Sequence, residues 1–577
     1  MSKQDKDIAS PMTTSGPRHG GQILADQLRI LGAEKVFCVP GESFLSLLDG
    51  LYEHRDSIDV ITCRHETGAS NMADAYAKMT GKPGICAVTR GPGATNASNG
   101  IHTAFQDSSP MIVLVGQVGR DMIEREAFQE IDYRRMFGEM AKWVAQIDDP
   151  RRIAEYLSRA WHVALSGRPG PVVLALPEDV LSEVTTAVDA RPSPMPASAP
   201  TPAAMDQISS LLSDAKRPLL VVGGPSWSAD CARMTLEFAE RLGLPVATSF
   251  RCQDYVDNRH PNYVGVIGIA PLANLRKRIA EETDLIIAIG PRFGEMTTQG
   301  YTLIDIPNPQ MKLVHVHPGP EELGRVYAPD LAIASSPGAF LAAAAELPAG
   351  HGVAGWADWR QQQRTDYEAF RVPVEGPGPL NMGEVVRHLS DELPDDAIVT
   401  NGAGNYSVWL HRFYSHRAYR TQLAPTSGSM GYGVPAAIAA KIETPEREVV
   451  CLAGDGCFLM TAQELATATR YDAGVIFLVV NNGMYGTIRM HQERNHPGRV
   501  IATELTNPDF VTYAMAFGIP GEKVKTTADF APAFARARAS RSGYLIELVV
   551  DPEALTPTQS LTAARTQGEQ NTKTRGT

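Results

Sequence analysis

Cysteine, long apolar runs and basic charge are all scarce in this chain of 577 residues. Its seven cysteines form no CxxC pair, and their odd number argues against disulfides or zinc, so we expect buried free thiols. The longest apolar runs, such as 475–480 and 111–115, are far shorter than the ~20 residues that a membrane-spanning helix needs. The formal net charge of −12 provides no basic surface for nucleic acid. We therefore expect neither a membrane nor a nucleic acid as a partner.

The N-terminus has no recognisable secretion signal. Residues 1–19 are polar and contain no apolar central region, so we predict a disordered tail and a cytoplasmic protein. What the chain does have is length, because 577 residues exceed the size that one hydrophobic core supports. Several domains and a large enzyme are the first expectation.

Helix-like segments alternate along the chain with short apolar runs, such as 36–39, 85–88, 219–222 and 449–452. This alternation predicts α/β domains with parallel sheets, and near-continuous apolar strands predict burial of both sheet faces. We predict an α/β fold of three consecutive domains, each with a parallel sheet flanked by helices. The predicted parts are a tail 1–19, an N-terminal domain 20–185, a Pro-, Ala- and Ser-rich linker 186–206, a central domain 207–350, a linker 351–379, a C-terminal domain 380–555 and a polar tail 556–577.

Two polar stretches follow neighbouring apolar runs of the C-terminal domain: AGDGCF at 453–458 and NNGMYG at 481–486. A T-x-x-E capping box at Thr461 and Glu464 predicts a helix that returns the chain to the second run, so both stretches should meet at the carboxyl edge of a sheet. Asp455 and Asn482 supply the hard oxygen donors that Mg²⁺ prefers beside phosphate. Gly454 and Gly456 lack side chains, so the backbone could approach a diphosphate. The alternative is two unrelated polar turns, because Gly, Asp and Asn are common turn residues.

This spacing of GDG and NN resembles the diphosphate signature of the thiamine diphosphate enzymes. The resemblance implies that Asp455, Asn482 and the carbonyl of Met484 bind the metal, and that the C-terminal domain binds the diphosphate. It also implies an N-terminal domain that binds the cofactor's aminopyrimidine ring through a glutamate.

The stretch RHETGA at 64–69 resembles the family segment that supplies this glutamate. By that resemblance Glu66 hydrogen-bonds ring nitrogen N1′ and favours the imino tautomer that removes the C2 proton of the thiazolium. The alternative for Glu66 is a helix-start glutamate that only complements the helix dipole.

Two further stretches resemble cofactor-binding segments of the family. In TSGSMGYGVPAA at 426–437, the carbonyl of Gly428 accepts from the 4′-amino group and Met430 bends the cofactor. In NGAGNYS at 401–407, Asn405 and Tyr406 contact the diphosphate. The same resemblance includes Cys457, Tyr485 and Gly486 among the cofactor-binding residues.

The resemblance covers residues of about 20–550. Within the family, it is to the acetolactate synthase and pyruvate oxidase group. It is carried by GPGATN at 91–96, AFQE at 127–130, SGRPGPVVLALPEDV at 166–180 and GPRFGEM at 290–296. It implies substrate contacts from Phe128 and Gln129, and a backbone N–H from Gly41 toward the developing oxyanion.

The implied activity is decarboxylation of a small 2-oxo acid such as pyruvate, followed by ligation of the enamine to a second carbonyl. Alternatives are another thiamine-dependent 2-oxo acid decarboxylase, an oxidase or an acyloin lyase, and less in keeping with the motifs, a non-catalytic cofactor-binding protein. In the family the cofactor lies between two subunits, so a homodimer or homotetramer is implied. A regulatory subunit is left open.

Several positions depart from the acetolactate synthase pattern. His491 replaces a tryptophan, Thr487 a methionine, Glu178 a lysine, and Ile269-Ala270 a Met-His pair. The resemblance implies that these positions shape the acceptor pocket, with Thr487 and His491 as substrate residues, so a strong preference for 2-oxobutyrate is not implied. Arg292 matches the synthase arginine, which either binds a carboxylate or lies at the surface.

The central domain resembles one that binds FAD in several relatives, with Gly223-Gly224 and Arg292 at the corresponding turns. However, His317 and Ser335-Ser336 stand where acetolactate synthases have acidic residues. The sequence therefore leaves FAD open.

Overall fold

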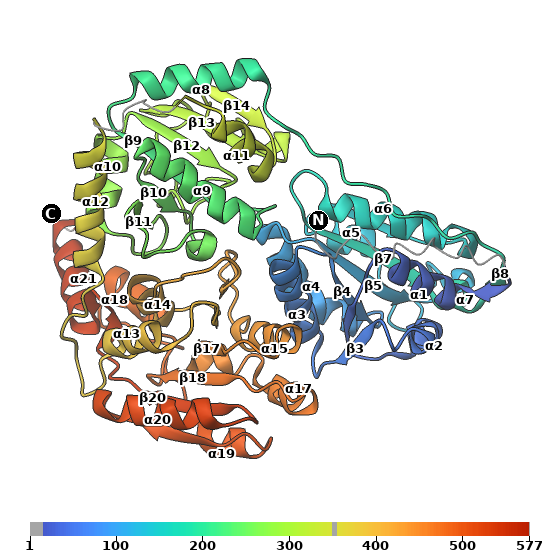
Figure 1. Ribbon diagram of the computed structural model, residues 1–577. Coiled ribbons are helices and arrows are strands. Elements are labelled where there is room, and N and C mark those ends of the chain that lie inside the picture. Colours follow the sequence, from blue (N-terminus) through green and yellow to red (C-terminus); the bar gives the residue numbers. More distant parts are fainter. Residues whose placement is uncertain (1–15, 349–354, 576–577) are drawn as a thin grey trace. The chain divides into compact units, whose positions relative to one another are not determined.

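The computed structural model describes residues 16–348 and 355–575. The chain divides into two compact units, Met1–Pro196 and Ala197–Thr577. Three six-stranded sheets organise it, one in the first unit and two in the second (Figure 1). Every strand pair in these three sheets is parallel. The predicted α/β fold with three parallel sheets is confirmed.

The first unit has the strand order β3-β2-β4-β5-β7-β6. Strands β4, β5 and β7 are buried along their whole length, as their unbroken apolar sequences predict. The strands are β2 Lys35–Cys38, β3 Asp59–Thr62, β4 Gly84–Val88, β5 Met111–Gln117, β6 Trp143–Gln146 and β7 Pro171–Pro177. The helices are α1 Gly20–Ile30, α2 Leu45–Glu53, α3 Glu66–Thr80, α4 Pro92–Asp107, α5 Tyr133–Phe137, α6 Ile153–Leu165 and α7 Glu178–Ser182.

The second unit contains the central sheet, with order β11-β10-β9-β12-β13-β14. Its strands are β9 Pro218–Val222, β10 Val246–Thr248, β11 Tyr263–Val266, β12 Leu285–Ile289, β13 Lys312–His317 and β14 Leu331–Ala334. Its helices are α8 Pro202–Asp214, α9 Ala229–Leu242, α10 Ala273–Glu281, α11 Pro337–Ala345 and α12 Ala357–Phe370. The apolar side chains of these elements form one continuous core.

The same unit contains the C-terminal sheet, with order β16-β15-β17-β18-β20-β19. Its strands are β15 Ile398–Asn401, β16 Gln422–Leu423, β17 Val449–Gly454, β18 Ile476–Asn481, β19 Gly521–Val524 and β20 Tyr544–Val549. Its helices are α13 Met382–Glu392, α14 Tyr406–Phe413, α15 Gly433–Glu443, α16 Asp455–Phe458, α17 Leu465–Arg470, α18 Gly486–Asn495, α19 Phe510–Met515, α20 Thr527–Ala539 and α21 Leu561–Arg575. Because β15, β17 and β18 are neighbours, the loops that follow them meet at one edge.

The predicted tail and first linker are shorter than the sequence suggested. Residues 1–15 lie outside the described residues, but Arg18–His19 forms strand β1, which pairs with β8, Val184–Thr185. At the start of the predicted linker 186–206, the buried Asp189 accepts a hydrogen bond from Arg18. Its end is already helical, because α8 begins at Pro202 with Thr201 as its N-cap. The prediction of 1–19 as a disordered tail is therefore wrong at its end, and the linker is wrong at both ends.

The second linker is also wrong where the structure describes it. Within 351–379, of which 351–354 lie outside the described residues, helix α12 buries Trp359 and Tyr367 beside the central sheet. Within the predicted polar tail 556–577, helix α21 packs on α18 (Figure 1). Both segments have polar sequences, yet tertiary contacts hold parts of them as helices.

Burial of the cysteines agrees with the sequence. All seven are free and buried. Among the described residues, no helix has the length and apolar character needed to cross a membrane.

Candidate active site

The predicted metal residues lie where β17 and β18 end side by side. Gly454 pairs with Val480 in the parallel register, and Asp455 begins α16 directly afterwards. The backbone N–H of Gly483 donates to Asp455 Oδ2 at 2.9 Å, so the GDG and NNG stretches contact each other. The expectation that they form neighbouring loops is confirmed.

The capping box that led to this expectation is not formed. A 3₁₀ turn begins at Ala462, but Thr461 makes no side-chain cap and instead donates to the carbonyl of Gly431 at 2.7 Å. Glu464 accepts from the hydroxyl of Thr467 at 2.6 Å. The helix start was therefore predicted at the correct place for a wrong reason, since both side chains bind other partners.

Asp455 is a buried carboxylate surrounded by N–H donors. Gly456 N donates to its Oδ1 at 2.9 Å, and the amide of Asn507 donates to its Oδ2 at 2.8 Å. Burial raises the pKa of Asp455, and these hydrogen bonds act in the opposite direction. Within the described part of the chain, no lysine or arginine forms an ion pair with it. A cation would compensate this buried charge.

The neighbouring donors have the chemistry of a magnesium site. Asn482 has an amide oxygen, which accepts from Met484 N at 3.2 Å, and the backbone carbonyl of Met484 accepts from Gly486 N at 2.9 Å. Carboxylate, amide and carbonyl oxygens are hard ligands, and Mg²⁺ takes few of them from the protein. The residues at this edge therefore fit Mg²⁺ together with a diphosphate.

The two glycines of GDG make room for aromatic rings. A Cβ on Gly454 would lie 2.8 Å from Cδ1 of Tyr406, and a Cβ on Gly456 would lie 2.5 Å from Cε1 of Tyr485. Both distances are too short for a real side chain. We expected these glycines to open the backbone to a phosphate, and the structure adds that each is packed against a tyrosine.

Tyr406 directs its hydroxyl into the domain. It accepts from Gly402 N at 3.0 Å and donates to the sulfur of Cys457 at 3.2 Å, which also accepts from Gly431 N at 3.2 Å. Burial raises the pKa of Tyr406 above its usual range. The phenol thus joins the loops after β15 and β17, and it is engaged there rather than free for a diphosphate.

Three other predicted cofactor residues surround these loops. Gly428 is exposed, with φ +69°, at a turn where its N–H donates to the carbonyl of Pro425 at 3.1 Å. Met430 is half-buried against the C-terminal core. Asn405, the residue before α14, accepts from the hydroxyl of Thr487 at 2.9 Å. The structure therefore brings the motifs at 401–407 and 481–487 into direct contact.

Helix α18 carries the predicted substrate residues. Thr487 and His491 are four residues apart on this helix and so lie on one face, with His491 exposed. At the helix start, Tyr485 packs against Gly456, and a Cβ on Gly486 would lie 3.2 Å from the amide nitrogen of Asn482. This helix leads from the sheet edge that carries Asp455 and Asn482 to the surface at His491.

Sequence reasoning missed Asn507. Its amide donates to Asp455 Oδ2 and, at 3.0 Å, to Asn481 Oδ1, so it fixes the carboxylate on the side away from Gly456. The stretch TNPDF around it reads as an ordinary turn, and no local pattern distinguishes it.

The first unit gathers its predicted residues at the carboxyl edge of its own sheet. Glu66 begins α3 after β3 and is buried, and the amide of Asn96 donates to its Oε2 at 3.0 Å. Gly93 lies beside the other oxygen, because a Cβ there would be 3.4 Å from Glu66 Oε1. Asn96 belongs to the GPGATN motif, for which no role of this residue is predicted, and it orients the carboxyl group.

Gly41 and Gln129 flank the segment that follows β4. A Cβ on Gly41 would lie 2.4 Å from Cβ of Thr89, so no side chain fits there. Gln129 has φ +66° and packs on Gly91, whose added Cβ would lie 2.7 Å from Cβ of Gln129. Phe128 is 73% exposed. Gly41, Glu66 and Gln129 are thus brought to one edge, with the Phe128 ring available for contact.

Glu178 pairs with Arg90, an arginine that the lysine of acetolactate synthases at position 178 would repel. Arg90 donates to Glu178 Oε2 at 2.9 Å and to the carbonyl of Phe128 at 3.2 Å. The carboxylate at 178 therefore supports the arginine that holds the Phe128 segment.

The central domain places Arg292 against its own Glu322, with Nε 3.3 Å from Oε2. Glu322 is buried, so Arg292 compensates an internal carboxylate, and the surface alternative does not describe it. Ile269 is 40% exposed, and Ala270 has φ +50° in the same loop. His317 is buried and bonded to Gly319, and burial lowers its pKa.

The glycine turn of the central domain is closely packed. A Cβ on Gly223 would lie 1.9 Å from Oγ of Ser249, and one on Gly224 would lie 1.8 Å from the carbonyl oxygen of Gly290. These glycines permit close packing of strand ends. The indole of Trp227 donates to the carbonyl of Gly223 at 2.7 Å, and the hydroxyl of Tyr255 donates to that of Gly224 at 2.5 Å. Protein groups thus satisfy the carbonyls of both glycines.

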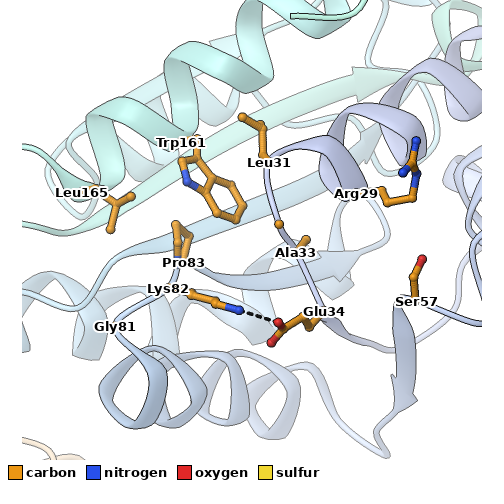
Figure 2. A pocket seen from close by; sticks show the side chains of 11 residues that line it. Arg29, Leu31, Ala33, Glu34, Ser57, Gly81, Lys82, Pro83, Trp161 and Leu165 are labelled. Carbon is orange, nitrogen blue, oxygen red and sulfur yellow. Dashed lines mark hydrogen bonds and ion pairs between the residues drawn. The ribbon is translucent and has the colours of Figure 1, made fainter. Parts of the chain in front are cut away.

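A cavity of about 450 Å³ lies at the opposite, amino edge of the first unit's sheet (Figure 2). Trp161, Leu31 and Pro83 form apolar walls, and an ion pair joins Lys82 to Glu34 at its rim. None of the predicted site residues lines it.

Comparison with known families agrees with this site. Models of the thiamine pyrophosphate enzymes match three parts of the chain: the N-terminal TPP binding domain at residues 18–136, the central domain at 205–344 and the C-terminal TPP binding domain at 402–548. The chain therefore belongs to the thiamine pyrophosphate enzymes, as its motifs predicted.

Within this family, the chain is similar to large subunits of acetolactate synthase. The chain is 35% identical to the acetolactate synthase large subunit of Parasynechococcus marenigrum, over 90% of this chain and 84% of the relative. It is 33% identical to that of Corynebacterium glutamicum, over 92% and 87%. It is 30% identical to the acetolactate synthase isozyme 2 large subunit of Escherichia coli, over 92% and 96%. The chain is an acetolactate synthase-like, thiamine diphosphate-dependent enzyme.

Proposed function

We propose that this enzyme decarboxylates a small 2-oxo acid such as pyruvate and joins the remaining two-carbon unit to a second carbonyl compound. With pyruvate in both roles, the C1–C2 bond of the first pyruvate breaks and carbon dioxide leaves. C2 of this first pyruvate then bonds to C2 of the second pyruvate, and one proton is taken up to give acetolactate. The single observation that carries this proposal is the contact of Asp455 with the NNG stretch at the edge of a family-matched cofactor domain.

Thiamine diphosphate, when bound, supplies the electron sink that decarboxylation requires. Asp455, Asn482 and the carbonyl of Met484 would hold Mg²⁺, which the diphosphate would also bind. Asn507 keeps the Asp455 carboxylate in place. The cofactor would be lined by Asn405, Gly428, Met430, Gly454, Gly456 and Tyr485. Behind them would lie Cys457, Tyr406 and Gly486.

Glu66 would hold a proton at the aminopyrimidine nitrogen N1′, and Asn96 orients it for this role. The backbone N–H of Gly41 would stabilise negative charge that develops on the substrate oxygen. Phe128 and Gln129 would contact the substrate, and Thr487 and His491 would contact the acceptor. Since Arg292 compensates Glu322, we do not propose it as a substrate ligand.

A second candidate acceptor is an aldehyde, which would make the product an acyloin. Arg90 is the guanidinium that contacts the Phe128 segment, and its charge is paired with Glu178. An uncharged acceptor needs no free cation beside the Phe128 segment. Glu178 in place of a lysine therefore favours an aldehyde as acceptor.

We also propose that the enzyme needs Mg²⁺ and works without FAD. The buried Asp455 carboxylate supports the first point, and His317 and Ser335-Ser336, which stand where acetolactate synthases have acidic residues, support the second. The relatives bear the name large subunit, and we propose a homodimer or homotetramer whose active sites join the first unit of one subunit to the second unit of another.

The test is an NMR assay of purified protein with thiamine diphosphate, Mg²⁺ and a panel of 2-oxo acids, with and without added aldehydes. Acetolactate from pyruvate alone would support the synthase function, and an acyloin formed only with aldehyde would support the second candidate. Turnover that survives both chelation of Mg²⁺ and removal of thiamine diphosphate would contradict the proposal. Flavin released on denaturation in proportion to protein would contradict the flavin-free form.

A further inference from the structure

Three residues of the central domain reach into the C-terminal domain beside the cofactor loops. They are Arg251, Gln253 and Asp254, which follow β10 and include part of the 3₁₀ turn η4, Gln253–Tyr255. Arg251, Gln253 and Asp254 are all at least 94% buried. The thiamine mechanism as proposed uses none of them.

Arg251 joins two loops with one guanidinium. Its Nη2 donates to the carbonyl of Gly402 at 2.8 Å, and its Nη1 donates to the carbonyl of Pro425. Gly402 opens the loop that carries Asn405, and the carbonyl of Pro425 also accepts from Gly428 N. The same side chain therefore fixes the starts of both loops.

Asp254 fixes the strand that leads into the second loop. Its Oδ2 accepts from the backbone N–H groups of Thr421 at 3.0 Å and Gln422 at 3.2 Å. A buried carboxylate that accepts two backbone N–H bonds is held tightly, so β16 cannot shift without breaking charge-assisted hydrogen bonds.

Gln253 and the backbone of Arg251 complete the connection. Gln253 N donates to the side-chain oxygen of Gln422 at 2.9 Å, and its amide donates to the carbonyl of His411 on α14 at 2.9 Å. Arg251 has φ +59°, a left-handed conformation that costs a non-glycine residue free energy. The chain bears this cost at the position from which the guanidinium reaches both carbonyls.

We propose that Arg251 and Asp254 are positioning residues, through which the central domain holds the 402–407 and 425–430 loops in the geometry that binds thiamine diphosphate. The inference rests on the proposed roles of Asn405, Gly428 and Met430. It gives the central domain a task that does not involve FAD.

The test compares Arg251→Met with Arg412→Met in the full-length protein. Arg412 is a matched control, because it is 8% exposed against 6% for Arg251 and donates from α14 to the carbonyl of Phe370 at 2.7 Å, but it contacts neither loop. Hydrogen exchange is measured first without cofactor. We expect exchange about tenfold faster in peptides that cover 402–407 and 420–430 in Arg251→Met, and wild-type exchange there in Arg412→Met.

The second measurement is the dissociation constant of thiamine diphosphate with Mg²⁺. We expect it to rise about tenfold in Arg251→Met, with partial recovery in Arg251→Lys, which keeps the charge and reaches one carbonyl. Asp254→Asn should weaken binding in the same direction. If Arg251→Met does not fold, Arg251→Gly takes its place, because glycine removes the side chain and tolerates φ +59°.

Unchanged exchange in both loops would overturn the proposal, and so would a wild-type dissociation constant in Arg251→Met. Faster exchange in a protein whose wild type binds no thiamine diphosphate would instead reject the proposed function and leave the loop contact standing. The cofactor-free measurement thus separates the two failures.

Discussion

Arg565 on α21 holds Glu493 on α18 through two hydrogen bonds, from Nε to Oε2 at 3.0 Å and from Nη2 to Oε1 at 2.7 Å. The Glu493 side chain is fully buried and also accepts from Arg489 and Gly498 N. Beside this pair, Gly568 packs so closely that an added Cβ would lie 2.1 Å from the carbonyl oxygen of Glu493. Helix α21 is therefore fastened to the helix that carries Thr487 and His491.

Loss of Arg565 should release α21. In Arg565→Met the buried Glu493 keeps Arg489 but loses the two hydrogen bonds from Arg565, and loss of hydrogen bonds to a charged group costs about 2 kcal/mol. We expect faster cleavage within 561–575 by a protease of broad specificity, which does not depend on the Arg565 side chain, and a lower free energy of unfolding. The control is Arg536→Met, whose partner Glu522 is at the surface, where a pair contributes about 0.5 kcal/mol. Equal effects of the two substitutions would contradict this interpretation.

The same pair should give the helix a defined pH dependence. Arg565, with help from Gly498 N and Arg489, lowers the pKa of Glu493 from 4.5 to about 2. Because the folded-state pKa is lowered, the stabilisation is complete above pH 4.5 and is lost as the pH falls toward 2. The difference in stability between wild type and Glu493→Gln should be constant from pH 7 to about pH 5 and shrink toward pH 3. Urea titrations at each pH measure it, and a difference that grows with acid would refute the assignment.

Asp455→Asn should weaken metal-dependent cofactor binding. The substitution keeps the size of the side chain but removes the buried charge that would attract Mg²⁺. We expect the thiamine diphosphate dissociation constant to rise about a hundredfold, in the range seen when a metal site is damaged. Asn507→Ala should show a smaller loss, because it removes only a hydrogen bond to the ligand. Isothermal titration with and without Mg²⁺ distinguishes the two, and wild-type affinity in Asp455→Asn would exclude this metal site.

Glu66→Gln should separate turnover from binding. Glutamine preserves the contact with Asn96 but cannot share a proton in the same way, so the rate constant should fall about a hundredfold, while the cofactor dissociation constant stays within about tenfold. Asn96→Ala should lower the rate by a smaller factor. Steady-state rates at saturating cofactor test this, and full turnover in Glu66→Gln would remove Glu66 from the mechanism.

Gly456→Ala should be destabilising because of Tyr485. The new methyl group would overlap the ring, and overpacking of this kind costs about 1–3 kcal/mol. Tyr485→Ala in the same chain should recover part of the loss. A double-mutant cycle in urea unfolding gives the coupling, and additive effects would show that the ring is not the obstacle.

Much of the site could be predicted from the sequence because it depends on strand ends. The apolar runs before Asp455 and Asn481 fixed both strands to within two residues, and parallel topology then placed both loops at one edge. Glu66 could be assigned in the same way, since it directly follows β3 and begins α3.

The remainder depends on contacts between distant parts of the chain. Asn507 and Asn96 gain their roles from partners 52 and 30 residues away, which no local spacing indicates. The hydroxyl of Tyr406 is diverted by Cys457, 51 residues away. Helix α21 has a polar sequence with an internal glycine, so its local preference for helix is weak, and the contact with Glu493 decides its structure.

The hydrogen bonds that Arg251 donates and Asp254 accepts also limit how this protein can be recombined. An enzyme engineer who exchanges the C-terminal domain with that of a relative would separate Arg251 from Gly402 and Pro425, and Asp254 from Thr421 and Gln422. A chimera should therefore take residues 251–254 and 402–425 from the same parent. The central and C-terminal domains are best exchanged together.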